Sequence, residues 1–100
     1  MSNLTIRPLD HDCIAVIGDL TFASIDKQSV HALPRTKAGG QLTVDLGQVS
    51  AADSAALALL IEWLKIARNR KFRLLFRNIP EQLQALARAS GFADLLRQSQ

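Results

Sequence analysis

Cysteine, aromatic residues and long apolar runs are all scarce in this 100-residue chain, and each scarcity excludes a class of protein. A single cysteine, Cys13, cannot form an internal disulfide, which indicates a reducing compartment. No apolar run reaches the roughly 18 residues that a membrane-spanning helix needs. The N-terminus lacks the basic-then-apolar order of a signal peptide. These absences predict a cytoplasmic protein.

Signatures of catalysis and of metal binding are missing as well. The chain has no glycine-rich phosphate loop, and Ser54 beside Asp53 has no histidine at a recognisable spacing. Nitrogen and sulfur ligands are limited to His11, His31 and Cys13, and no closely spaced pair of them shares one face. We therefore expect no catalytic residue, no metal and no cofactor. A domain of this size favours a binding or regulatory module over an enzyme.

Charge is unevenly distributed along the chain. The formal net charge is +3, but residues 1–53 hold four basic and six acidic groups, whereas residues 54–100 hold eight basic and three acidic groups. The basic excess peaks between Lys65 and Arg77. Such a cluster fits nucleic acid or anionic lipid, or simply the solvated end of a helix whose dipole it complements. Stacking aromatics are too few for a single-strand binding platform, so we expect no nucleic-acid partner.

Hydrophobic periodicity predicts one α/β domain over residues 1–100, with the element order β-β-α-β-α-β-α. Strand–helix–strand units joined by short loops imply parallel pairing in the middle of a mixed sheet, with helices packed against it. Thr21 is a possible N-cap of the first helix, residues 47–53 are expected to form a loop, and residues 92–96 add one helical turn. The strands are expected at residues 4–7, 13–18, 41–46 and 72–76. The helices are expected at residues 21–33, at 54–69, and from residue 80 or 81 to about residue 90.

The strongest predicted helix begins at Asp53 and Ser54. Asp53 is a candidate N-cap, or alternatively pairs with Ser50 in an arrangement like a capping box. Ser54 is either a small residue in the first turn of the helix or an accessible hydroxyl whose phosphorylation would act as a switch. A phosphate there would add about two negative charges, which the helix N-terminus tolerates but an apolar partner contact does not.

The same helix is predicted to be apolar on two sides. At about 100° per residue, Leu59, Trp63 and Ile66 lie roughly opposite the face that would contact the sheet, where polar residues are expected. Either the last helix covers them, or the core is rotated around the helix, or a partner covers them. A tryptophan among aliphatic residues is typical of an interface centre. We predict a partner interface of these three residues with Ser54. The sheet-facing residues are Leu57, Leu60, Ile61 and Leu64.

Three segments resemble the STAS domain, named for sulphate transporters and anti-sigma-factor antagonists. They are GDLTF at residues 18–22, VDL at 44–46 and DSAALALL at 53–60. The resemblance covers almost the whole chain and implies about four strands backed by helices on one side. In the bacterial antagonists of this family, a partner kinase phosphorylates the Ser or Thr after the aspartate. That position is Ser54 here, with Asp53 before it.

One branch of the family fits better than the others. GDLTFASI, DSAALALLIEWLKIAR and NIPEQLQALARASGFADLL are similar to the small cytoplasmic, MlaB-like STAS subunit of the Mla ABC transporter, which maintains outer-membrane lipid asymmetry. The resemblance implies a non-catalytic subunit that supports the ATPase subunit and meets the membrane only indirectly. It places Ser54, Leu59, Trp63 and Ile66 at the ATPase contact. The alternative is an anti-sigma factor antagonist, regulated by phosphorylation of Ser54, whose partner is an anti-sigma factor kinase.

Overall fold

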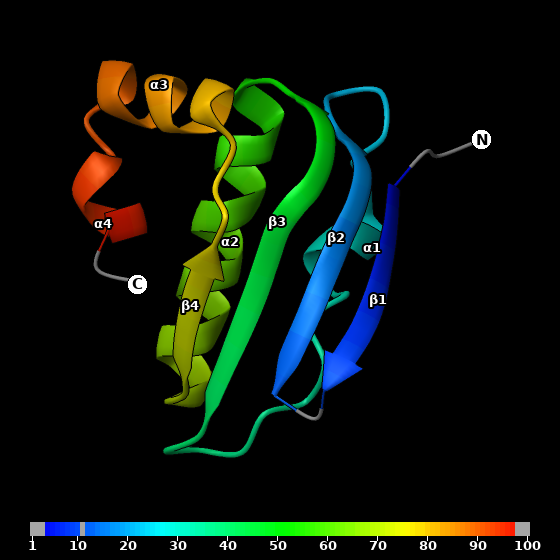
Figure 1. Ribbon diagram of the computed structural model, residues 1–100. Coiled ribbons are helices and arrows are strands. Elements are labelled where there is room, and N and C mark those ends of the chain that lie inside the picture. The colour runs from blue at the N-terminus through cyan, green and yellow to red at the C-terminus, as the bar shows by residue number, and fades with distance from the viewer. Residues whose placement is uncertain (1–3, 11, 98–100) are drawn as a thin grey trace.

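The computed structural model describes residues 4–10 and 12–97 and contains one mixed sheet in the order β1-β2-β3-β4 (Figure 1). β1 runs antiparallel to β2, whereas β3 lies parallel to both β2 and β4. The predicted strand and helix order and the mixed pairing are confirmed. The strands are β1 (Leu4–Asp10), β2 (Cys13–Leu20), β3 (Gln41–Ala52) and β4 (Arg73–Arg77).

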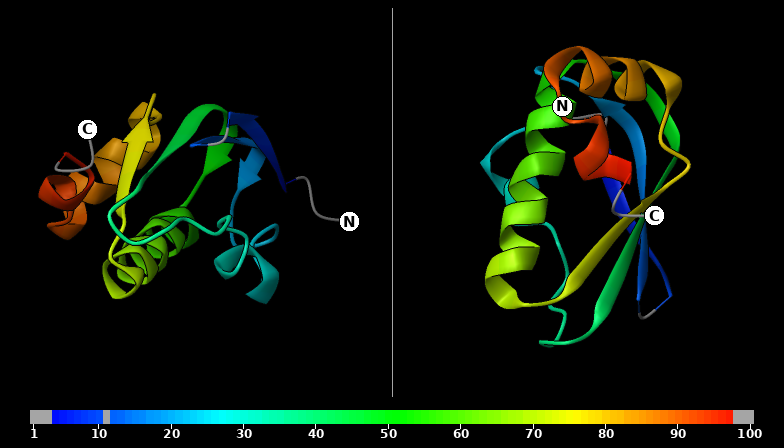
Figure 2. Two further views of the ribbon diagram at one scale, coloured as in Figure 1. Left: turned by 90° about the horizontal axis from the view of Figure 1, so that it is seen from below. Right: turned by 90° about the vertical axis from the view of Figure 1, so that its left-hand side faces the viewer.

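The helices pack on one side of this sheet. α2 runs beneath the sheet, with α1 on one flank and α3 and α4 on the other (Figure 2). Gly91, at φ +80°, ends α3 in the left-handed conformation, as its position after the periodic segment predicts. The helices are α1 (Lys27–Val30), α2 (Ser54–Arg70), α3 (Glu81–Ser90) and α4 (Ala93–Arg97).

Alternation along β3 determines which face of the sheet meets the helices. Leu42, Val44 and Leu46 are buried, whereas Thr43 and Asp45 between them point to the opposite, helix-free face. Leu74 and Phe76 of β4 continue the buried row. The core therefore lies between the sheet and α2.

The first predicted helix is wrong over most of its length. Residues 21–24 form a turn, and only Lys27–Val30 are helical, with Asp26 rather than Thr21 as the N-cap. The Ser24 hydroxyl donates to the Asp19 carbonyl at 2.6 Å, and the Thr21 N–H donates to the Ser24 hydroxyl oxygen. These local bonds offer the backbone an alternative to the helix, as short hydroxyl side chains often do.

The loop expected at residues 47–53 is also wrong, because β3 continues to Ala52. This second half of β3 pairs in parallel with the end of β2, where Ile17 lies opposite Gln48 and Leu20 opposite Ala52. Two register shifts accommodate the irregular sequence. The turn expected at residues 10–12 includes His11, which lies outside the described residues.

Candidate functional site

The expectation that Trp63 lies on an open face of α2 is wrong. Its side chain is fully buried, and its indole Nε1–H donates to the Ser29 carbonyl at 3.1 Å. Leu59 is 2% exposed, and Ile66 is partly buried against the same core. None of the three offers an unpartnered apolar surface within this chain.

The error has a geometric cause. The buried positions of α2 form one broad apolar arc centred near Ala56, Leu60 and Trp63, rather than two separate faces. Leu59 lies on one flank of this arc, where α1 contacts α2. Ile61 lies on the other flank and is partly buried against the core, and α3 also contacts α2. When elements of the same chain cover a helix over such a wide arc, its apolar residues are buried without a second protein.

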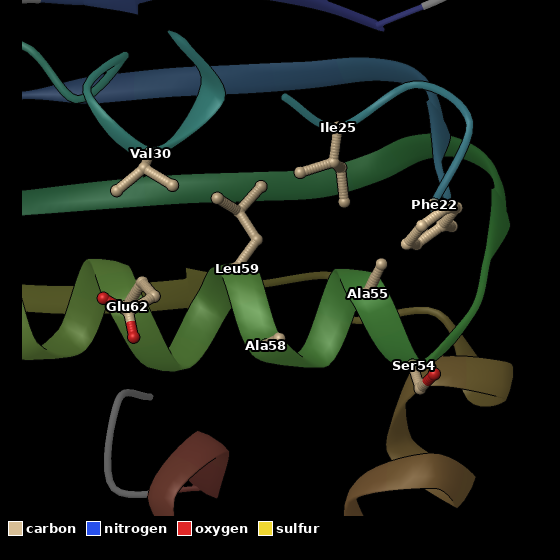
Figure 3. Close-up of a pocket in the computed structure, with 8 residues that line it drawn as sticks. All are labelled: Phe22, Ile25, Val30, Ser54, Ala55, Ala58, Leu59 and Glu62. Atoms are coloured by element: carbon tan, nitrogen blue, oxygen red, sulfur yellow. The ribbon is translucent and has the colours of Figure 1, made fainter. Parts of the chain in front are cut away.

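An open apolar groove nevertheless lies beside α2. It has a volume of about 520 Å³ and separates the first half of α2 from the segment that carries α1 (Figure 3). Leu59 points from α2 toward Ile25 and Val30 and closes the base of the groove. The lining residues, here called the groove, are Phe22, Ile25, Val30, Ser54, Ala55, Ala58, Leu59 and Glu62.

Phe22 is the most exposed large apolar side chain of the described residues, at 86%. It lies near the start of α2, above Ala55 (Figure 3). The exposed Ala58 leaves the groove shallow along α2. An exposed ring beside small side chains suits the insertion of a partner's apolar side chain.

Asp53 fixes the two walls of the groove to each other. Its Oδ1 accepts the Ala55 N–H at 2.9 Å, which confirms the predicted N-cap of α2. Its Oδ2 accepts the Phe22 N–H at 3.0 Å. One carboxylate therefore holds the turn that carries Phe22 against the first turn of α2. The alternative pairing of Asp53 with Ser50 is not the arrangement found.

Ser54 is the first residue of α2 and is exposed at the mouth of the groove. The structure thus brings Ser54 and Leu59 together and leaves Trp63 and Ile66 outside the lining. Sequence reasoning missed Phe22, Ile25 and Val30 as groove residues. The spacing of Phe22 and Ile25 predicted one face of the longer helix at residues 21–33, and Val30 lay off that face.

On the helix-free face of the sheet, Asp45 has a lowered pKa. The Gly47 N–H, donated to Oδ1 at 2.8 Å, lowers this pKa most, and partial burial opposes the effect. Arg77 on β4 donates to Oδ2 at 3.0 Å and Asn78 to Oδ1 at 3.2 Å, and both lower the pKa further. This cluster is held by contacts within the chain and shares no residue with the groove.

Within residues 4–10 and 12–97, no three His, Cys, Asp or Glu side chains are gathered as metal ligands would be. No helix in that part of the chain combines the length and the apolar character needed to cross a bilayer.

Comparison with known proteins gives one family. The family model described as "Mlab, STAS domain" matches residues 6–97. No curated protein matches the chain. The matched range includes the groove, the whole sheet except its first two residues, and every helix.

Proposed function

Because the chain belongs to the MlaB-like STAS domain family, we propose that it is an accessory subunit that binds and stabilises the ATPase subunit of a phospholipid ABC transporter. Membership in the family supports an accessory or regulatory role, and STAS domains are generally non-catalytic. The identity of the partner, the ATPase subunit, goes beyond what family membership supports and is our proposal. In this proposal the protein works at the cytoplasmic face of the inner membrane and contributes to outer-membrane lipid asymmetry.

The observation that carries the proposal is the exposed ring of Phe22 beside the groove. An apolar side chain that is 86% exposed contributes little to the stability of the isolated fold. Its burial by a partner would contribute much more to the free energy of binding. The proposed contact therefore loses Trp63 and Ile66, keeps Ser54, and gains Phe22 and Ala58. Leu59 remains in it as the base of the groove.

The proposed effect on the ATPase is a shift in its conformational equilibrium. A bound subunit changes that equilibrium only if it binds one conformation more tightly than the others. Asp53 supports this role because it holds Phe22 and the start of α2 in a fixed relation before binding. A preformed surface loses less entropy on association.

Ala58→Glu tests the proposed contact, because it places a charge in the groove at an exposed helical position. We expect recovery of the co-expressed ATPase of a phospholipid ABC transporter from the same genome to fall at least tenfold. Ala89→Glu is the matched control, since it makes the same change at an exposed position of α3. Phe22→Ala provides a second variant that removes apolar contact without adding charge.

Equal recovery with Ala58→Glu, Phe22→Ala and Ala89→Glu, all with normal circular dichroism, would exclude the groove as the ATPase contact. The exposure of Ser54 favours a second candidate, an anti-sigma factor antagonist. Incubation with cell extract and ATP distinguishes it: a phosphate mass gain that Ser54→Ala abolishes, without ATPase recovery, supports the antagonist.

A further inference from the structure

Two stretches of the chain contain basic residues and no acidic ones. No Asp or Glu occurs between Asp26 and Asp45, or between Glu62 and Glu81. The first stretch carries Arg35 and Lys37 in the loop before β3. The second carries the end of α2 and the start of β4. The basic residues in this second part are Arg68, Arg70, Lys71 and Arg73.

The fold brings these two stretches together at one end of the molecule, seen from below in the left view of Figure 2. The Gly39 N–H donates to the Lys71 carbonyl at 2.7 Å, and the Arg73 N–H donates to the Gly40 carbonyl at 2.9 Å. A hollow at this end is lined by Arg35, Thr36, Lys37 and Arg70. We call this hollow with Arg68, Lys71 and Arg73 the basic tip.

The positive charge of the basic tip is not neutralised within the described residues. The three ion pairs among the described residues are formed by cations outside the basic tip, namely Lys65, Arg77 and Arg88. Asp10 and Asp12 lie at the β1–β2 connection, next to the start of β3, where the Asp12 carbonyl accepts the Thr43 N–H. Neither forms an ion pair with a cation of the basic tip among the described residues.

The helix dipole explains only part of this arrangement. Arg68 and Arg70 lie in the last turn of α2, where the dipole favours cations. Arg35 and Lys37 belong to no helix, yet backbone bonds hold their loop against the same end. Like charges held together repel one another, and a bound anion relieves that repulsion.

We propose that the basic tip docks directly onto the phosphate headgroups of an anionic lipid surface, with the hollow receiving one headgroup, which is a contact beyond the indirect one that the family resemblance implies. Guanidinium groups bind phosphate oxygens in a two-point fork, and each cation at an anionic lipid surface strengthens binding by about fivefold. Cations on a loop, a helix end and a strand start suit a surface of many phosphates. The exposed large apolar side chains of the described residues, Leu9, Phe22 and Phe92, are outside the basic tip, so it has no base-stacking platform.

This contact is compatible with the groove but does not depend on it. The groove begins at Ser54, at the amino end of α2, and the basic tip is at Arg70, at its carboxyl end. Along α2 the groove lining extends from Ser54 to Glu62, and Glu62 is eight residues, or about 12 Å, from Arg70. The groove and the basic tip share no lining residue, so each can be changed by substitution without altering the lining of the other.

The test is co-sedimentation of the full chain with equimolar phosphatidylglycerol–phosphatidylcholine vesicles and with vesicles of phosphatidylcholine alone. We expect binding only to the anionic vesicles, decreasing as salt rises. The double variant Arg35→Gln with Arg70→Gln should weaken this binding roughly 25-fold. The control double variant, Lys27→Gln with Arg88→Gln, removes the same charge elsewhere and should weaken it less than threefold.

Absence of binding to anionic vesicles, or equal weakening by the two double variants, would overturn the proposal. A single-stranded oligonucleotide that displaces the vesicles at lower concentration, and that the Arg35 and Arg70 changes weaken equally, would assign the basic tip to nucleic acid instead. Thermal unfolding of both double variants verifies that each is folded.

Discussion

At the scale of single residues, Trp63 shows how one side chain can satisfy its apolar ring and its polar N–H inside the same chain. The ring is fully buried in the core, and Nε1–H reaches the Ser29 carbonyl of α1. This bond ties the shortest helix to the longest one. It also positions the segment that forms one wall of the groove, which contains Ile25 and Val30.

Trp63→Phe should lower the free energy of unfolding by about 1–3 kcal/mol, because it removes a buried donor and part of the ring volume. Urea denaturation monitored by circular dichroism measures this change. As the only tryptophan in the chain, Trp63 should also emit at short wavelength in the native state and shift to the red on unfolding. Native emission typical of a solvated indole, with a cost below about 0.5 kcal/mol, would contradict its burial.

At the scale of elements, β3 joins the two halves of the sheet and has different partners along its length. Residues 41–45 pair with β4, and residues 43–52 pair with β2. Asp45 lies at the end of the first pairing, where it accepts from Arg77 on β4 and from Gly47 ahead of it. The carboxylate therefore links β3 to β4 at the point where β4 ends.

Asp45 should give stability a specific dependence on pH. Its folded pKa lies below the unfolded value of about 3.9. Its contribution is therefore fully present above the unfolded pKa and is lost as pH falls through the folded pKa. Asp45→Asn should cost about 0.5–1 kcal/mol near pH 7, since solvent screens the partly exposed pair.

Urea denaturation of wild type and Asp45→Asn across acidic pH measures the difference between them. It should stay constant above about pH 5 and shrink below about pH 4. A difference that grows as the pH is lowered would contradict the assigned direction.

At the scale of the whole molecule, the apolar groove and the basic tip occupy opposite ends of α2. The groove forms where the turn at residues 21–26 lies beside the start of α2. The basic tip forms where the loop at residues 34–40 lies beside the end of α2. α2 thus acts as a rigid spacer between two surfaces of different chemistry.

The two surfaces should respond independently to substitution. Ala58→Glu should reduce ATPase recovery and leave vesicle binding within twofold, and the Arg35→Gln and Arg70→Gln pair should do the reverse. Distant sites without shared contacts behave additively, so the combined variant should show both losses unchanged. Co-purification and co-sedimentation on the same preparations measure both. Loss of vesicle binding in Ala58→Glu would show that the surfaces are coupled.

The sequence by itself determined the element order, the N-cap Asp53 and the start of α2 at Ser54. These features depend on neighbours within one or two turns: strand alternation, helical spacing and a capping side chain act locally. The family resemblance also lay in such contiguous segments, and the match to residues 6–97 confirms it.

Only the tertiary structure decided the length of β3, the burial of Trp63 and the composition of both surfaces. Residues 47–52 become strand because β2 supplies their hydrogen-bond partners. The apolar arc of α2 is covered because the segments around α1 and α3 reach its two flanks. The groove and the basic tip each join residues more than 25 positions apart. Periodicity along one helix gives the direction of each side chain, but which directions are covered depends on chain segments that are distant in sequence.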